Sequence, residues 1–366
     1  MTPVPLHTSE ATVIGAANGW GKRLADTLTE AGCTVHRVDI DTPQWQVDAA
    51  LAASACICLA IPDDAIGDWL ARHTGQLRGK CLIDCATNKN AFAETLKALA
   101  NDGVSVCSTH PMAAADSALR GQNCLIMPLG RNSADAEAFA RSLYRRLDMH
   151  LHGLAFTHHG ELMLVVQMLP HLMQRLYLAL LQQGLAPIGL AVGELTETAS
   201  ANYLLNELGI GRVASQRASV SAGILETGLN SERGRMLLEY LKQQVLLVQQ
   251  NAGSREQLAA QFEQDVTALD PQGTWRTAMA EKTEAALNRL GNLRSRSLVL
   301  EAPNRIGMLR DILSVLADHG IDMTALDSQL LEGDRRVRFE IGIGSAEIDT
   351  ASLTLDLTKH ETEMLR

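Results

Sequence analysis

The sequence predicts three domains: an α/β domain with a parallel sheet, an all-helical domain, and a small α+β domain. From Glu10 to about Gly153, short apolar runs alternate with amphipathic stretches, which is the pattern of a parallel sheet with helices on both faces. From there to about Leu290, strand signals vanish and helical periodicity dominates. Strand and helix signals then return together. We therefore place the domains at residues 1–153, 154–292 and 293–366.

Short apolar runs bounded by turn residues predict the strands of the first domain. These runs are Ala11–Ile14, Thr34–Asp39, Ala55–Ala60, Lys80–Asp84, Val104–Ser108 and Cys124–Met127. Amphipathic stretches between them predict helices, and they include Lys22–Ala31, Asn90–Ala100 and Ala134–Arg146.

The helical domain carries more apolar surface than one core requires. We expect its helices to break at Pro187, Gly228, Gly253 and Pro271–Gly273, and one to begin at the capping pair Ser254-x-x-Gln257. Apolar residues between Met236 and Val248 cover more than one helix face. This surplus predicts an interface between two copies, and hence a homodimer.

The C-terminal segment predicts the beginning of a βαββ unit. Ser297–Glu301 is a strand and Gly307–His319 an amphipathic helix. Met323–Leu331 and Arg335–Ile343 form a hairpin across residues 332–334. After Ile343, Leu353, Leu355 and Leu357 alternate as in a single strand, which leaves little room for a further helix. The unit is therefore expected to be incomplete.

Composition and charge exclude several classes of partner. Hydrophobic residues make up 46% of the chain and charged residues 20%, with a formal net charge of −10. This balance argues against a nucleic acid or an anionic membrane, whose phosphates require a basic surface. The longest apolar run, Ala49–Ile61, is too short to span a bilayer, and Met1–Glu10 shows no targeting pattern. We expect a soluble, cytoplasmic protein.

The cysteines are expected to be reduced. There are seven, an odd number, and several fall inside apolar strand-like runs. The pairs Cys56–Cys58 and Cys81–Cys85 have ligand-like spacing, but nothing downstream completes a zinc pattern. We interpret the cysteines as small buried hydrophobes and expect no metal site.

The segment after the first strand has the composition of a dinucleotide-binding turn. Glycines at a strand-to-helix turn let the backbone approach a pyrophosphate, which then lies on the N–H groups of the helix. The expected cofactor-binding residues of this turn are Gly15, Ala16, Asn18, Gly19, Trp20 and Gly21. Asp39 closes the second strand, where a carboxylate can accept both ribose hydroxyls and repel a 2′-phosphate. The sequence thus predicts a Rossmann-like domain that binds NAD rather than NADP.

The glycine spacing departs from G-x-G-x-x-G. In the register that ends at Gly21, Ala16 and Asn18 occupy the first two glycine positions. Gly15, Gly19 and Gly21 instead follow a G-x-x-x-G-x-G spacing. A strand-to-helix turn without a ligand is the alternative interpretation, and Asp39 favours the nucleotide.

Four segments together resemble the prephenate dehydrogenase family of aromatic amino-acid biosynthesis, over about residues 10–290. Two of them end predicted strands, where ligands bind in open α/β sheets. The segments are Asp84-Cys85-Ala86-Thr87-Asn88-Lys89, His110-Pro111-Met112, the helix from His159 through Gln167 to His171, and Gly211-Arg212-Val213. The resemblance implies a Rossmann domain followed by a helical dimerisation domain.

The resemblance also implies an activity, the NAD-dependent oxidative decarboxylation of prephenate to 4-hydroxyphenylpyruvate in tyrosine biosynthesis. Hydride leaves ring C4 for NAD, carbon dioxide leaves C1, and the ring becomes aromatic. Arogenate is the close alternative substrate. A catalytically weak homologue that senses an amino acid or binds a partner is the alternative from another class.

By family match, His110 accepts the proton of the C4 hydroxyl, a role that suits a neutral imidazole. Thr87, where the family usually has serine, hydrogen-bonds the same hydroxyl, and His171 completes the catalytic set. Arg212 clamps a carboxylate with its planar guanidinium, Lys89 adds a mobile positive charge, and Gln167 lies one helical turn from His171.

Each of these assignments has a structural alternative. His110 fits a turn, His171 a core histidine, Arg212 a surface salt bridge, and Lys89 an ordinary first-turn lysine. Four other histidines are interpreted as structural or solvated: His150, His152, His158 and His159.

The chain departs from the family pattern at both the expected substrate site and the expected cofactor site. Ala113-Ala114 follow His-Pro-Met where the family usually has Phe-Gly, and Leu204 stands near a second family arginine. With Ala16 and Asn18 in the glycine turn, these changes favour an altered pocket, a different cyclohexadienyl substrate or a weakened enzyme.

The segments Ala302–Leu309 and Gly320–Gln329 resemble ACT domains, which are ferredoxin-like and bind an amino-acid effector between paired copies. The family's Glu-Ser-Arg appears here as Asp327-Ser328-Gln329, without the arginine. The resemblance implies an aromatic amino-acid effector at this domain, and the alternative is a unit that only packs or dimerises.

Overall fold

The structure, a computed structural model, describes residues 9–190, 194–195, 200–215, 218–294, 297–331, 335–344 and 348–365. By contacts within the chain it divides into two compact units. The first comprises residues 1–170 and 222–235, and the second comprises residues 171–221 and 236–366. Each is described by itself.

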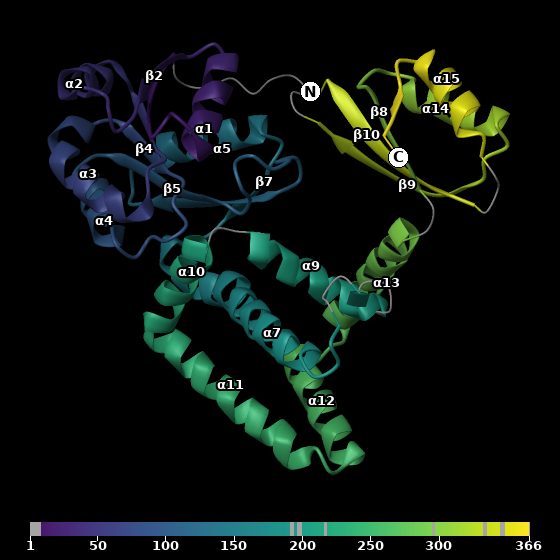
Figure 1. Cartoon of the computed structure of the whole chain (residues 1–366). Coiled ribbons are helices and arrows are strands. Elements are labelled where there is room, and N and C mark those ends of the chain that lie inside the picture. Colours follow the sequence, from purple (N-terminus) through teal and green to yellow (C-terminus); the bar gives the residue numbers. More distant parts are fainter. Residues whose placement is uncertain are drawn as a thin grey trace. The chain divides into compact units, whose positions relative to one another are not determined.

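A seven-stranded sheet in the order β2-β1-β3-β4-β5-β6-β7 forms the centre of the first unit (Figure 1). Its strands are β1 (Glu10–Ile14), β2 (Thr34–Val38), β3 (Cys56–Leu59), β4 (Cys81–Asp84), β5 (Ser105–Pro111), β6 (Asn123–Leu129) and β7 (His150–Gly153). The order reverses between β1 and β3, and such a point in an open α/β sheet has its ligand crevice at the carboxyl ends of the strands.

Helices cover both faces of this sheet, as the alternating pattern predicts. They are α1 (Gly19–Glu30), α2 (Gln44–Ala53), α3 (Asp63–Leu77), α4 (Ala93–Asn101) and α5 (Ala134–Arg146). Residues of α1 and α5, such as Leu24 and Phe139, share one buried cluster with the strands. Residues of α2, α3 and α4, such as Leu51 and Leu70, share the other. The predicted α/β fold is confirmed.

Two features of the sheet differ from the prediction. β6 pairs antiparallel with β5, because residues 112–122 between them form no helix and are too short for the crossover that parallel pairing requires. β7 was not predicted, because its sequence His-Leu-His-Gly has no apolar run.

The cysteines lie on one face of the sheet and are thiols. None of the seven forms a disulfide bond, and they lie in or against the cluster under α1 and α5. Burial raises the pKa of the Cys85 thiol to about 12 and that of Cys107 to about 12. Within the described ranges, no group of three or more His, Cys, Asp or Glu is arranged to hold a metal ion.

The chain then becomes helical. The first unit includes η1 (Phe156–His158), α6 (His159–Met163), the π-helical turn η2 (Leu164–Met168), and the part of α10 (Ala218–Asn230) and α11 (Glu232–Asn251) within residues 222–235. The second unit holds most of α7 (Leu169–Leu185), then α9 (Ala201–Ser215), α12 (Arg255–Leu269) and α13 (Thr274–Arg294).

The predicted breaks between these helices are found, and the one predicted at Gly228 lies at Ser231, between α10 and α11. The Ser254 hydroxyl caps α12 by accepting from the N–H of Gln257, 3.2 Å away. Gly228 itself lies in the last turn of α10, where a Cβ atom would meet Met168 Cγ at 2.3 Å. Glycine there therefore also permits close packing of the helices.

One helical stretch of the described chain, Phe156–Leu185, is long and apolar enough to cross a membrane by length and composition. Only 17% of its apolar window is buried within the chain. A single helix of this kind is weak evidence for a span, and it fits the exposed apolar surface expected of an interface helix.

The C-terminal sheet has the antiparallel order β11-β8-β10-β9. Its elements are β8 (Ser297–Pro303), α14 (Met308–Asp318), β9 (Met323–Leu330), β10 (Arg336–Ile343), α15 (Thr350–Thr358) and β11 (Glu363–Met364). Both helices share one apolar cluster with the strands. The predicted hairpin is confirmed as β9 and β10, and its turn at residues 332–334 lies outside the described residues.

The prediction of an incomplete unit is wrong. Asp349 caps α15 through hydrogen bonds from the N–H groups of Ala351 and Ser352, and β11 then completes the sheet. Leu353 and Leu357 are buried one helical turn apart, whereas Leu355 between them is 64% exposed. The residues that alternate as in a strand are thus the inner and outer faces of a short helix.

Candidate active site

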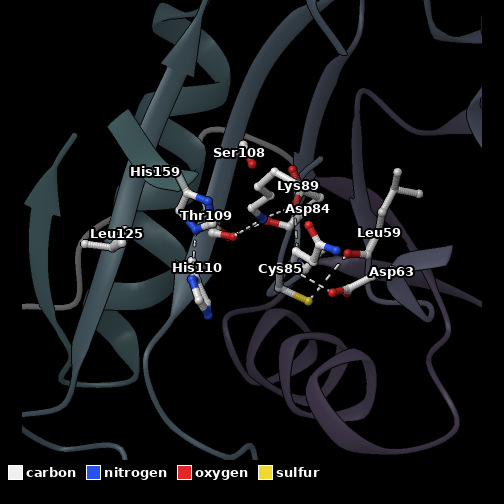
Figure 2. A network of polar contacts seen from close by, with 12 residues as sticks. Leu59, Asp63, Asp84, Cys85, Lys89, Ser108, Thr109, His110, Leu125 and His159 are labelled. Atoms are coloured by element: carbon white, nitrogen blue, oxygen red, sulfur yellow. Dashed lines mark hydrogen bonds and ion pairs between the residues drawn. The ribbon is translucent and has the colours of Figure 1, made fainter. Parts of the chain in front are cut away.

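His110 lies at the carboxyl end of β5 and contacts a second histidine. Its Nδ1 and the Nε2 of His159 are 3.0 Å apart and share a hydrogen bond (Figure 2). Both side chains belong to residues only 3% exposed. His110 lies at the end of β5, and His159 is the first residue of α6.

Both imidazoles are held in the neutral form. Burial, then the nearby ammonium of Lys89, then His159 lower the pKa of His110 to about 2. Burial and Lys89 lower the pKa of His159 to about 4. At neutral pH each ring therefore has one N–H donor and one nitrogen lone pair, and both rings are weaker bases than free imidazole.

Lys89 is the fixed charge beside this pair. It is 3% exposed, forms an ion pair with Asp84, and donates to the carbonyl oxygen of Thr109 at 2.7 Å. The expectation of a mobile charge at Lys89 is corrected, because a lysine anchored to two strands cannot follow a ligand. Its ammonium acts on the histidines through space instead.

The carboxyl ends of β4 and β5 are cross-linked by further hydrogen bonds. The hydroxyl of Thr109 donates to the backbone carbonyl of Asp84, so the hydroxyl of Tyr144, 2.9 Å away, donates to Thr109. This network fixes the strand residue that precedes His110.

The loop after β4 is anchored to the start of α3. The N–H groups of Asn88 and Thr87 donate to the Asp63 carboxylate, the former over 2.6 Å. Burial raises the pKa of Asp63 against the effect of these bonds. The Thr87 side chain is half-buried on this loop.

Gly15 and Gly21 are the glycines that the turn after β1 requires. Gly15 has φ +86°, and a Cβ there would lie 2.5 Å from the carbonyl oxygen of Ala60. A Cβ on Gly21 would lie 1.8 Å from the carbonyl oxygen of Gly15. Gly15 thus permits the tight turn and Gly21 the close approach of α1.

This turn fits a dinucleotide. Ala17, Asn18 and Gly19 are exposed, and Asn18 makes no side-chain cap on α1, which leaves the N–H groups of its first turn open to a phosphate. The Asp39 carboxylate lies beside the turn and accepts from the N–H of Ala17 at 2.8 Å. NAD or NADP would be held by these residues.

Trp20 connects the glycine turn to the segment after His110. Its indole N–H donates to the carbonyl oxygen of Ala113 at 3.2 Å, and its ring meets Tyr144 edge-on, with centroids 6.2 Å apart. The backbone at Ala113 is therefore held by Trp20, at the end of the turn after β1.

The remaining predicted residues lie partly in the second unit. There the pKa of His171 is lowered by burial and by the charge of Arg212. His171 and Arg212 are therefore close enough to interact electrostatically. The Arg212 side chain is exposed on α9, and Leu204 is buried on the same helix. Gln167 lies in the π turn of the first unit, which interrupts the α-helical spacing used to pair it with His171.

Sequence reasoning missed His159, which it interpreted as structural or solvated. His110 and His159 are distant in the sequence, and periodicity carries no information on such contacts. The signal that could have identified it was the family-like motif from His159 to His171, because His159 is the first residue of that motif. The role of Asp84 as the partner of Lys89 was also missed.

No protein-family model and no curated protein sequence matches the chain. Among solved structures, the fold is similar to that of prephenate dehydrogenases. One from Aquifex aeolicus has a TM-score of 0.52 and 13% identity, covering 72% of this chain and 99% of its own. Another structure of the A. aeolicus enzyme, in complex with hydroxyphenyl propionate and NAD⁺, has a TM-score of 0.50 and 14% identity, covering 74% and 100%.

A protein of Corynebacterium glutamicum, provisionally named a prephenate dehydrogenase, has a TM-score of 0.51 and 16% identity, covering 78% of this chain and 98% of its own. At these identities the similarity establishes the fold, which combines a Rossmann sheet with a helical region.

Proposed function

We propose that the protein is an NAD-dependent prephenate dehydrogenase, which converts prephenate to 4-hydroxyphenylpyruvate, with arogenate as the alternative substrate. The observation that carries the proposal is His110, a buried neutral imidazole at the carboxyl end of a strand in a dinucleotide-binding fold. Its nitrogen lone pair can accept one hydroxyl proton, and burial and the charge of Lys89 make it a weaker base than free imidazole in the unliganded chain.

The chain's own residues would manage the proton and orient the substrate. His110 accepts the proton of the C4 hydroxyl, and the Thr87 hydroxyl hydrogen-bonds the same oxygen. Arg212, whose guanidinium is exposed, pairs with a substrate carboxylate, and His171 and Gln167 bind the ring substituents. Bound NAD would supply the hydride acceptor. Loss of carbon dioxide then leaves an aromatic ring.

The test is NADH production, followed by absorbance, with NAD and prephenate or arogenate supplied. We expect turnover in the native chain and a loss of about 10²-fold or more in His110→Asn, the usual scale for a missing general base. His150→Asn, which changes an exposed histidine of the same unit, should leave the rate unchanged. No NADH with either substrate would refute the proposal.

A second candidate, a catalytically weak sensor or partner-binding protein, is favoured by Leu204. A leucine only 8% exposed stands near the position of a family arginine, so a substrate anchor is missing. This candidate predicts binding of prephenate, seen by calorimetry, without NADH production.

For the C-terminal sheet we propose a weakly bound aromatic amino-acid effector. Gln329 lies on β9 without the positive charge of the family's arginine, which removes a charge-assisted bond to a carboxylate. A thermal shift at millimolar but not micromolar tyrosine is expected. We further propose a cytoplasmic homodimer.

A further inference from the structure

The hydrogen bond between the two buried histidines limits which nitrogen of His110 can act as a base. Its Nδ1 is occupied by His159 Nε2 at 3.0 Å. A substrate proton can therefore be accepted only at Nε2. Nε2 has a lone pair only if the single ring proton of neutral His110 is on Nδ1.

Two arrangements of protons satisfy the 3.0 Å contact. If His159 donates from Nε2, His110 must carry its proton on Nε2 and cannot act as a base there. If His110 donates from Nδ1, its Nε2 is free and His159 is the acceptor. Only the second arrangement supports proton removal.

We propose that His159 is a positioning residue: by accepting a hydrogen bond from Nδ1–H of His110, it keeps the Nε2 of His110 unprotonated and turned toward the substrate. The inference rests on the proposed function and assigns a role to a histidine that the sequence analysis interpreted as structural or solvated. His159 contacts neither the substrate nor the reacting atoms in this role.

Lys89 acts on both histidines. Burial, and then its ammonium, which is paired with Asp84, lower the pKa of His110 and of His159, so the same charge that keeps His159 neutral also opposes protonation of His110. A neutral His159 retains the lone pair that the hydrogen bond requires. When His110 takes up a proton, its Nδ1–H becomes a charged donor and the bond to His159 strengthens, so the interaction favours the transition state over the ground state.

The helix that carries His159 is held in the same compact unit as His110. Asn88, on the loop after β4, donates to the hydroxyl of Thr227 in α10 at 3.0 Å. Glu161 pairs with Arg233 at 3.0 Å. These contacts connect α6 to the start of α11 and connect α10 to the sheet edge, so the position of His159 is built into the unit.

The experiment compares three single variants. His159→Leu removes the acceptor, His159→Gln keeps an acceptor oxygen, and His158→Leu makes the same change at the exposed neighbour. We expect His159→Leu to lower kcat about 10- to 100-fold with little change in KM. His159→Gln should recover most of the rate, and His158→Leu should match the native chain.

A double variant tests whether His159 acts through His110 or independently of it. His110→Asn combined with His159→Leu should be no slower than His110→Asn alone, because residues that act as a unit are not additive. Multiplied losses would overturn the inference, as would native kcat in His159→Leu. Failure of the proposed function is distinct: it appears as no turnover in the native chain or full turnover in His110→Asn.

Nitrogen-15 NMR of histidine-labelled protein reads the tautomer without substrate or cofactor. His110, assigned by its loss in His110→Asn, should show Nδ1 protonated and Nε2 bare in the native chain and in His159→Gln. In His159→Leu it should revert to the Nε2–H form. An Nε2–H tautomer in the native chain would overturn the inference directly.

Discussion

The sheet edge at β4 and β5 buries charge, whereas the helices α7 and α11 expose apolar side chains. Asp84 and Lys89 are 2% and 3% exposed. By contrast, large hydrophobic residues on the two helices are more than a third exposed, and they include Met173, Leu176, Leu180, Met236, Tyr240, Val245 and Leu246. Each region reverses the usual distribution of polar and apolar groups.

The two reversals have different physical meanings. A buried ion pair rarely adds net stability over an apolar pair of the same volume, so its presence beside His110 indicates a functional use of the charge. An extended apolar surface is unfavourable in water until something covers it, so the helices indicate an interface. Four predictions test this contrast.

The largest effect is expected at the buried ion pair. Asp84→Asn leaves the Lys89 ammonium buried without its counter-charge, which should lower the free energy of unfolding by about 3–5 kcal/mol. Urea unfolding measures the loss. The control is Glu94→Gln, which breaks the exposed pair with Lys97 and should cost about 1 kcal/mol or less. Equal losses would show that burial of the pair is unimportant.

The next effect is a loss of stability in mild acid. The pKa values of His110 and His159 in the folded chain, about 2 and about 4, lie below the ordinary 6.5. The unfolded chain therefore binds more protons than the folded chain below pH 6.5, and stability falls as pH drops from 6.5 toward 4. Each histidine contributes up to about 1.4 kcal/mol per pH unit. The raised pKa of Asp63 acts in the opposite direction.

Urea unfolding at several pH values between 7 and 4.5 measures this slope. In His159→Gln the slope should decrease by the contribution of one histidine. An unchanged slope in that variant would mean that His159 is protonated in the folded protein. The carboxylates with lowered pKa values, such as Asp26 and Asp356, lose their contribution only at lower pH, so they do not obscure the result.

The exposed helices give the third prediction. The chain should sediment as a dimer, and Val245→Glu with Leu246→Glu should weaken it, because both side chains are more than half exposed and charge opposes burial in an interface. The control is Phe262→Glu on α12, also exposed. A dimer that survives the first change but not the second would place the interface on α12.

Sequence patterns predicted most elements of this fold but could not distinguish faces within a short segment. Leu353, Leu355 and Leu357 alternate, and only the capping carboxylate of Asp349 reveals that the segment is helical. The glycine at position 228 predicts the end of a helix. Its close contact with Met168, which is distant in sequence, could not be predicted from the pattern.

The same limit applies to the candidate site. His110 was identified by its match to the family's His-Pro-Met motif and by its place at a strand end, where ligands bind, and both are local information. The contact of His110 with His159 and that of Lys89 with Asp84 depend on tertiary packing, which local sequence patterns do not reveal. The glycines of the turn after β1 could be predicted because their roles depend on local backbone geometry. Gly15 and Gly21 do lie where a Cβ atom would clash with the backbone.

The smallest effect is expected at Asp39, which lies at the sheet edge like Asp84 but is partly exposed. Its carboxylate accepts from the N–H of Ala17 and of Ile40, and each oxygen retains a lone pair for a ribose hydroxyl. A 2′-phosphate would meet this charge in partly screened solvent, where repulsion at about 4 Å is worth roughly 1–4 kcal/mol. We therefore expect calorimetry to show tighter binding of NAD than of NADP by about tenfold or more, and Asp39→Ser to remove most of that difference. Because the charge is solvated, Asp39→Ser should also leave stability nearly unchanged, unlike Asp84→Asn. Equal affinities in the native chain would show that Asp39 does not meet the ribose.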